Sequence, residues 1–354
     1  MERISQRTRA LALDAAIRRL EEQDPTAADV ATAGGRVRFA GRETMRSERL
    51  PFTSTVHKAA LLVILSVGVV VGAAAIDDPY VFATIDPPGA TWAEAYGINA
   101  VGDIVGVYGD AAGQHGFLLE RDEFASIDYP GANLTSAFGI NPGGEIVGVY
   151  RLPGEPASRR HGYLLTKEGV FVPIDVPGHL NTIPTRILPD GTIVGCYHDG
   201  NSTTTMYGFV MNAEGLSEFS ESGTMHYGAT PDGQTVVGRY INNSTTQPFY
   251  GHWGYVADGS EFTRFRFPGS AFTQAFDINP VREIVGWYRL GPIGSTDIHG
   301  FLMRDWVFTT LDYPGGIQTW AVGINPGGDV VGGYYGTDRL GGHAFLASRT
   351  GWGR

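Results

Sequence analysis

Cysteine is nearly missing from the chain. Cys196 is the single cysteine among 354 residues, so the chain can form no internal disulfide. This thiol replaces the valine of a repeated Gly-Val-Tyr sequence inside an expected strand, which favours a buried and inert side chain. A phosphate-binding loop, HExxH, GxSxG and Cys-x-x-Cys are missing as well. The sequence therefore carries none of the local signatures of nucleotide, zinc-protease, serine-hydrolase or dithiol chemistry.

Positive charge is also scarce. Lys and Arg number 26 against 37 Asp and Glu, which gives a formal net charge of −11. Residues 1–58 carry 11 of the basic and 8 of the acidic residues, so the remainder has a net charge of −14. A nucleic-acid partner requires a basic face, so we expect no nucleic-acid binding.

Long apolar runs are limited to one segment, the 17 residues 59–75. It follows a basic stretch and ends in Ala73-Ala74-Ala75, which is the pattern of a secretory signal peptide. This pattern predicts an extracellular or periplasmic protein, with Met45 as a candidate true start. The run is also at the short limit for a membrane span. An uncleaved anchor therefore stays open as the one expected membrane contact.

The residues before this run are expected to form a leader. Residues 6–23 contain good helix formers and predict one amphipathic helix, whereas the rest of 1–58 is expected to be disordered. The folded domain is then expected at 76–354.

Glycine, by contrast, is abundant, with 50 residues, and it recurs in a repeated phrase. The clearest copy is FGINPGGEIVGVY at Phe138–Tyr150. Successive copies are 42, 47, 43, 48 and 46 residues apart, a period typical of β-propeller blades. The glycine of the Ile-Val-Gly-x-Tyr core stands two residues before a tyrosine each time, at Gly106, Gly148, Gly195, Gly238, Gly286 and Gly332.

Each repeat contains four short segments of strand character. In the second repeat these are 124–128, 135–141, 145–150 and 161–165. We predict an all-β fold, a six-bladed β-propeller of four-stranded blades with the Gly-Ile-Asn strand innermost.

Closure of this ring has two possible phases. The strand 81–86 would join the blade formed by 319–347 and so clasp the two ends of the domain. The alternative is six complete blades without a clasp.

The full pattern is ID-x-PGA…GIN-x-x-G-x-IVG-x-Y…HGF. It resembles a family of bacterial extracellular repeat proteins, the HAF-repeat family, named after the triplet His-Ala-Phe. That triplet stands at His343-Ala344-Phe345, and related triplets include His115-Gly116-Phe117 and His161-Gly162-Tyr163. The resemblance covers residues 82–347. It implies an exported, propeller-like repeat protein and no particular reaction, so it assigns no catalytic residue.

Two polar residues recur with the phrase. A histidine stands at the fourth strand of four repeats, and an aspartate precedes an x-Pro-Gly turn in four: His115, His161, His299 and His343, with Asp86, Asp128, Asp175 and Asp312. We predict that they make hydrogen bonds inside each blade. No cofactor is expected, but a Ca²⁺ ion held by several of the aspartates stays open, because Ca²⁺ prefers oxygen ligands.

Non-repeated residues are the better candidates for function. The Asp-x-Pro-Gly turns and the dissimilar loops after the Ile-Val-Gly-x-Tyr strands are predicted to share one face of the ring, which we call the variable-loop face. Variable loops on a rigid repeat frame are where binding usually occurs. The candidate ligand-binding residues on this face are Trp92, Arg151, Arg159, Arg160, His179, His198, Tyr250, His252 and Trp320.

The leading hypothesis for function is an exported, non-catalytic, monomeric binding module for a glycan, a peptide or a protein. One alternative is a polysaccharide lyase or hydrolase with its site at the channel mouth. Another is a membrane-anchored sensor whose first 58 residues face the cytoplasm. Catalytic carboxylates converge only in space, so the sequence names no catalytic residue.

Overall fold

The computed structural model describes residues 80–199, 206–219, 223–242, 251–291, 294–337 and 341–350. All regular structure in these ranges is β-strand. The predicted helix at 6–23 and the apolar run at 59–75 lie outside them, and the described ranges contain no helix that could span a membrane.

The strands follow the four-segment pattern of the repeats. The first three units contain β2 (Trp92–Ile98), β3 (Ile104–Gly109), β4 (Gln114–Glu120), β5 (Glu123–Ile127); β6 (Leu134–Ile140), β7 (Ile146–Arg151), β8 (His161–Leu165), β9 (Phe171–Ile174); β10 (Asn181–Ile187), β11 (Ile193–His198), β12 (Met206–Asn212) and β13 (Gly215–Glu218). The remaining units contain β14 (Thr224–Ala229), β15 (Thr235–Asn242), β16 (Gly251–Asp258), β17 (Glu261–Phe265); β18 (Phe272–Ile278), β19 (Ile284–Arg289), β20 (Ile298–Arg304), β21 (Val307–Thr310); β22 (Gln318–Ile324), β23 (Val330–Tyr335) and β24 (Gly342–Arg349).

Strands within a unit pair antiparallel in chain order. The first two units share one sheet through a single parallel pair, Gln114 with Leu134. The last unit gains its fourth strand from the other end of the domain. β1 (Tyr80–Thr84) pairs with β24, with Tyr80 opposite Arg349. This is the pairing that the clasp arrangement predicts.

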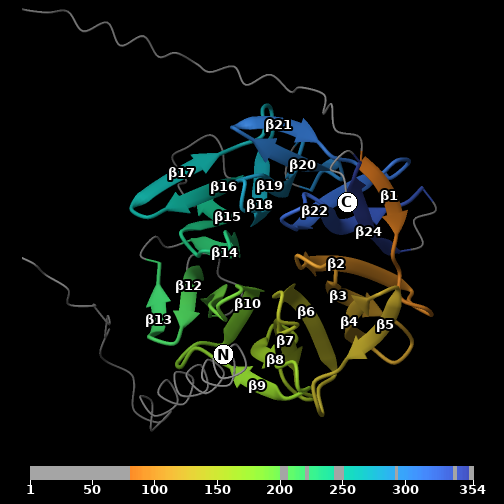
Figure 1. Cartoon of the computed structure of the whole chain (residues 1–354), viewed down its shortest axis with the longest axis vertical. Helices are drawn as coiled ribbons and strands as arrows, with labels where there is room; N and C mark the ends of the chain where they lie inside the picture. Colours follow the sequence, from red (N-terminus) through yellow and green to blue (C-terminus); the bar gives the residue numbers. More distant parts are fainter. Residues whose placement is uncertain are drawn as a thin grey trace, which may run out of the picture. The chain divides into compact units, whose positions relative to one another are not determined.

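The Gly-Ile-Asn strands lie innermost, as predicted. β2, β6, β10, β14, β18 and β22 each contact the next, and β22 contacts β2. Figure 1 shows the sheets following one another around a common centre, from orange β2 through green to blue β22. Neighbouring inner strands approach so closely that a Cβ on Gly97 would lie 2.7 Å from the carbonyl oxygen of Phe138. The domain therefore has a β-propeller fold.

The repeated glycine of the Ile-Val-Gly-x-Tyr core makes room for an aromatic ring. A Cβ on Gly286 would lie 2.7 Å from the ring of Phe301. The equivalent aromatic side chain is fully buried in every unit, as Phe117, Tyr163, Phe209, Tyr255, Phe301 and Phe345. Cys196 is fully buried beside this layer, and burial raises the pKa of its thiol to about 12, in agreement with the prediction of an inert side chain.

Candidate ligand-binding face

The repeated histidines and aspartates bond to each other, as the prediction of a blade-internal contact requires. The imidazole Nδ1 atoms lie 2.6–2.8 Å from the carboxylate oxygens in all four pairs: His115 with Asp128, His161 with Asp175, His299 with Asp312, and His343 with Asp86. Each imidazole also packs on the tyrosine of its own Gly-x-Tyr sequence. These residues therefore join the second and third strands of a unit to the turn that follows its fourth strand.

Among the described residues, a second carboxylate reaches three of these histidines from the variable loop. The Nε2 atoms of His115, His161 and His299 lie 3.2, 2.8 and 2.9 Å from carboxylates of the loops after β3, β7 and β19, namely Asp110, Glu155 and Asp297. The turns and the variable loops thus meet at one face, as predicted.

These carboxylates change the titration of two of the histidines. Burial alone would lower the pKa values of His115 and His299. Hydrogen bonds and negative charge from Asp128 and Asp312, supported by Asp110 and Asp297, outweigh burial and raise both pKa values.

The pairing places the four candidate calcium aspartates in separate units, each against its own histidine. Within the described ranges, no three His, Cys, Asp or Glu side chains gather as a metal site would require. In the fourth unit Trp253 and Arg266 stand where the histidine and aspartate are expected. The Arg266 guanidinium lies 3.8 Å from the Trp253 ring centroid, so a cation–π contact takes the place of the ion pair.

Two neighbouring cross-strand residue pairs near this face differ in how far their residue types are repeated between units. The inner pair joins a Thr, or once an Ala, to the tyrosine of the Gly-x-Tyr sequence in every unit: Ala93–Tyr108, Thr135–Tyr150, Thr182–Tyr197, Thr224–Tyr240, Thr273–Tyr288 and Thr319–Tyr334. The pair one residue closer to the variable-loop face has no common chemistry: Trp92–Gly109, Leu134–Arg151, Asn181–His198, Phe272–Arg289 and Gln318–Tyr335. We call these five the rim pairs.

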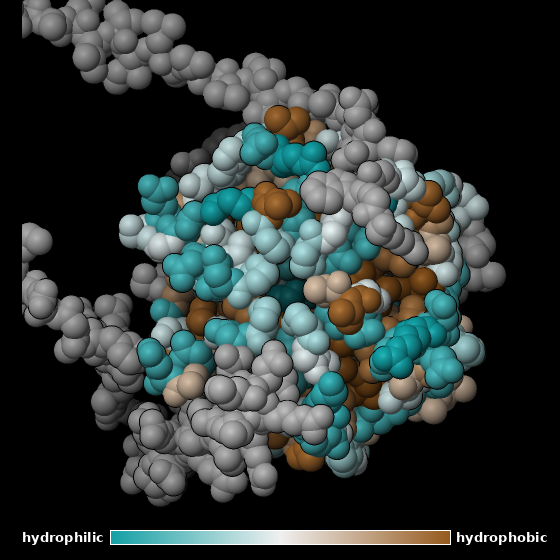
Figure 2. Space-filling model, in the orientation of Figure 1, coloured by the Kyte–Doolittle hydropathy of each residue, from teal (hydrophilic) through white to brown (hydrophobic). Residues whose placement is uncertain are grey.

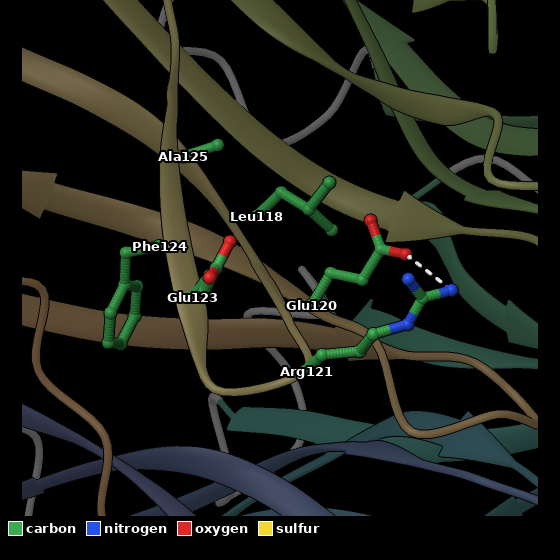
Figure 3. A pocket seen from close by; sticks show the side chains of 6 residues that line it. All are labelled: Leu118, Glu120, Arg121, Glu123, Phe124 and Ala125. Atoms are coloured by element: carbon green, nitrogen blue, oxygen red, sulfur yellow. Dashed lines mark ion pairs between the residues drawn. The ribbon is translucent and has the colours of Figure 1, made fainter.

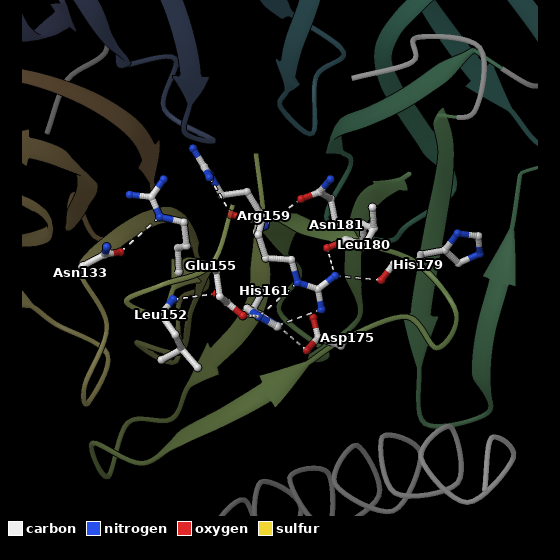
Figure 4. A network of polar contacts seen from close by, with 11 residues as sticks. Asn133, Leu152, Glu155, Arg159, His161, Asp175, His179, Leu180 and Asn181 are labelled. Carbon is white, nitrogen blue, oxygen red and sulfur yellow. Dashed lines mark hydrogen bonds and ion pairs between the residues drawn. The ribbon is translucent and has the colours of Figure 1, made fainter. Parts of the chain in front are cut away.

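The predicted residues Arg151, Arg159 and Arg160 all donate hydrogen bonds to backbone carbonyls of the second unit or its neighbour, and Figure 4 shows Arg159 beside His161. Arg159 donates to the backbone carbonyls of His179 and Leu180, and its guanidinium contacts the ring of His161. Arg151 and Arg160 both donate to the carbonyl of Ala157, at 3.1 and 2.8 Å. Burial, followed by the charge of Arg151, lowers the pKa of Arg160. The guanidinium groups of these arginines therefore form hydrogen bonds within the loop and to the neighbouring unit.

The third unit places two more predicted residues beside this network. His179 lies 3.0 Å from the carboxylate of Asp199, which also accepts a 2.9 Å hydrogen bond from the backbone N–H of Leu180. His198 lies opposite Asn181 in a rim pair, 3.4 Å from its side-chain amide. The structure therefore brings five of the nine predicted residues into one neighbourhood.

The other predicted residues lie elsewhere on the ring. Trp92 covers Gly109 within the first rim pair, and Trp320 packs edge-on against Tyr335 in the last unit. His252 contacts Phe272, with ring centroids 3.9 Å apart. Tyr250 lies outside the described residues.

An ion pair occupies the centre below the rim. Arg186 and Asp277 stand where four units have glycine, and their side chains are buried and 3.0 Å apart. Arg186 also donates to the carbonyls of Phe138 and Val322, so four of the six units meet at this pair. Figure 2 shows hydrophilic residues around a hollow at the centre of the face in view.

Glu94 holds on β2 the ladder position that Trp320 holds on β22. It accepts a 2.7 Å hydrogen bond from the Tyr96 hydroxyl, and burial raises its pKa.

Several residues on this face were missed by sequence reasoning. Arg239 and Trp287 occupy the position that holds valine in the first two units, and Phe272 and Arg289 form a rim pair. The signal that marks Arg239 and Trp287 in the sequence is a departure from the repeated phrase inside a strand, at the position that Cys196 occupies in the third unit.

A separate shallow pocket lies away from this face, on the outer hairpin between β4 and β5 (Figure 3). Glu120, Glu123 and Arg121 line it beside Leu118, Phe124 and Ala125. The Glu120–Arg121 ion pair is exposed at 3.5 Å, which is typical of a solvated hairpin end.

The chain is similar in structure to several solved proteins, but the comparisons assign it to no family. No protein-family model and no curated protein matches the chain. The SapL1 lectin in complex with alpha methyl fucoside is similar at 10% identity and a TM-score of 0.49, over 75% of this chain and 95% of the lectin. A putative TolB from Agrobacterium tumefaciens is similar at 14% identity and 0.46, over 70% and 79% of the two chains. The β-propeller domain of the Trilobed protease from Pyrococcus furiosus is similar at 12% identity and 0.46, over 73% and 94%. These similarities are too distant to carry a function to this chain.

Proposed function

We propose that the chain is a binding module that holds a glycan, a peptide or a protein on its variable-loop face. The observation that carries the proposal is the contrast between the repeated inner pairs and the rim pairs. The inner pairs are nearly constant, since the tyrosine recurs in all six units and the threonine in five of them, as in Thr273–Tyr288. The rim pairs, one residue away in the same strands, change from tryptophan to arginine to histidine. Such positions on a constant frame are available for recognition.

We also infer that the frame is a ring of six blades closed by β1. Six four-stranded units, the cyclic contacts of the inner strands and the β1–β24 pairing support this inference. A closed ring holds the rim pairs at fixed separations, which favours binding without a conformational change.

The test is a screen of the purified chain against glycan and peptide arrays. We expect at least one class of ligand to be retained by the wild-type chain and by a variant in a short turn of the opposite face, Arg282→Gln. The same ligand should be lost when a rim pair is changed, as in Phe272→Leu/Arg289→Gln. Binding that survives such a change in each of the five rim pairs, or that Arg282→Gln abolishes, would contradict the proposal.

Glu94 supports a second candidate function, polysaccharide cleavage at the channel mouth. Burial raises the pKa of the Glu94 carboxyl, which is the direction of shift that a general acid requires, and the hydroxyl of Tyr96 orients the carboxyl by donating a hydrogen bond to it. In that case a reducing-end assay over a polysaccharide panel would detect turnover by the wild-type chain and none by Glu94→Gln. Turnover unaffected by this change would remove Glu94 from the mechanism.

For cellular location we propose export through residues 59–75, cleaved near Ile76. N-terminal sequencing of the secreted protein should then begin close to that residue. A membrane-bound product that keeps residues 1–75 would instead favour the anchored sensor.

A further inference from the structure

A cluster of basic and aromatic side chains surrounds the rim pair of the fifth unit. Phe272 and Arg289 are opposite each other on β18 and β19, and the guanidinium lies 4.4 Å from the ring centroid. The Trp287 ring stacks on Phe272 at 4.9 Å, and the His252 ring approaches it at 3.9 Å. Three strands therefore supply one aromatic layer with a guanidinium beside it.

Arg239 extends this cluster from the fourth unit. The pairs Arg239–Gly254 and Ile241–His252 place Arg239 and His252 on the same face of the β15–β16 ladder. The Nη2 atom of Arg239 contacts the thioether sulfurs of Met206, at 3.6 Å, and Met225. Its Nε atom is buried and, among the described residues, has no hydrogen-bond partner.

The pKa of His252 reflects the positive charge of the cluster. Burial lowers the pKa of its imidazole, and the positive charges of Arg239, Arg289 and Arg266 lower it further, to about 3. His252 is therefore neutral at physiological pH, and its Nδ1 atom lies 3.4 Å from the side-chain amide of Gln274. The positive charges of three guanidinium groups thus act on one imidazole.

Arg239 and Arg289 differ from Arg186, Arg282 and Arg159 in their partners. Arg186 pairs with Asp277, Arg282 with Asp258, and Arg159 donates to carbonyl groups. In the described part of the chain, neither Arg239 nor Arg289 has a carboxylate or carbonyl partner. Acidic residues outnumber basic ones in this domain, so their absence from this cluster does not follow from composition. The buried Nε atom of Arg239 has no oxygen partner among the described residues, which is costly, and an anionic ligand would remove that cost.

We infer that this cluster binds an acidic saccharide through the carboxylate of a uronate residue. The inference rests on the proposed binding function and names its ligand class. A guanidinium binds a carboxylate through two parallel hydrogen bonds, and aromatic faces suit the apolar faces of a sugar ring. Arg239, Arg289 and Gln274 supply donors, whereas a peptide would also require acceptors for its own N–H groups. An acceptor-rich sugar acid therefore fits this surface better than an acidic peptide.

The experiment is calorimetric titration of the whole protein with an oligogalacturonate. The comparison ligands are a neutral galactose oligomer of the same length, a sulfated dextran oligomer and poly-glutamate. The variants are Arg239→Gln and Arg289→Gln, with Arg282→Gln as the matched control, since it removes the same charge on the opposite face. Melting temperatures are measured for all three.

The expected result is binding of oligogalacturonate by wild type and Arg282→Gln, with a loss of about tenfold or more in affinity for each of the other variants. Affinity should fall as salt is raised. If Arg239→Gln does not fold, Arg289→Gln at the strand end decides the outcome alone.

Equal binding by all variants, equal binding of the neutral oligomer, or tighter binding of sulfated dextran or poly-glutamate would overturn the uronate assignment. If another ligand binds other rim pairs while oligogalacturonate does not bind, the assignment fails and the proposed function stands. If no ligand binds this face, both fail.

Discussion

The imidazole of His343 lies 2.7 Å from the carboxylate of Asp86, although 257 positions separate the two residues in the chain. Asp86 also accepts a 2.9 Å hydrogen bond from the backbone N–H of Ala344. Inside other units the same pair is local, as between His115 and Asp128. In the other units that carry it, the histidine bonds to an aspartate in the turn that follows within the same unit. In the last unit this aspartate is Asp86, which comes just after the first described strand, β1.

The first prediction concerns this clasp. Removal of residues 1–86 should lower the melting temperature sharply, because β24 loses its partner strand and Arg349 loses its 3.0 Å bond to the Tyr80 hydroxyl. Removal of residues 1–79 is the matched control and should leave the melting temperature nearly unchanged. Equal melting of the two truncated proteins would show that β1 does not close the ring.

The second prediction concerns the repeated glycine. Gly286→Ala should destabilise the domain by roughly 1–3 kcal/mol or more, because the new Cβ would press on Phe301 and on the backbone of Gln274. Gly342→Ala should be tolerated, since its nearest neighbours would be 3.7 Å away or further. Denaturant unfolding of both variants gives the two values, and similar losses would refute the packing account of the phrase.

The third prediction concerns the central ion pair. Arg186→Gly or Asp277→Gly alone should cost roughly 3–5 kcal/mol, because each leaves a buried charge without its partner. The double variant restores the glycine found in the four other units and should lose less than the sum of the two single changes. A double-mutant cycle of unfolding free energies measures this coupling, and strict additivity would mean that the pair does not act as a unit.

The fourth prediction concerns pH. The pKa values of His115 and His299 are raised in the folded state, so their stabilising effect is complete below the unfolded value of about 6.5 and is lost as pH rises through the folded values. Burial instead lowers the pKa values of His226 and His252 to about 3, so these two destabilise the fold as pH falls below that unfolded value. Titration of the imidazole signals by NMR should separate the two groups. Midpoints for His115 below that of free histidine would be inconsistent with the bridging carboxylates.

Much of the fold follows from the sequence because it is repeated. The period, the innermost Gly-Ile-Asn strand and the contact of the repeated histidine inside its blade all come from residues that recur at fixed spacing. The Asp partner of His343 could be named only once the clasp phase was fixed.

The site was less predictable. Arg186 and Asp277 form an ion pair across the ring, and their spacing along the chain does not predict this contact. Arg239 lies inside a strand. Because its neighbours keep the alternating pattern of a β-strand, the arginine in place of valine is easily overlooked. Arg151 and Arg159 depart from the repeated pattern and were predicted to bind a ligand, and in the structure both donate hydrogen bonds to the protein's own backbone.

The most direct test of the account is amide hydrogen exchange of the protein with and without a ligand recovered from the arrays. The account predicts protection at the strand ends that carry the rim pairs, at Trp92, Arg151, His198 and Phe272, and none at the Pro-Gly-Gly turn after Asn141. Protection at that turn or along the outer strands, with the rim pairs unaffected, would contradict the claim that the ligand binds the variable-loop face.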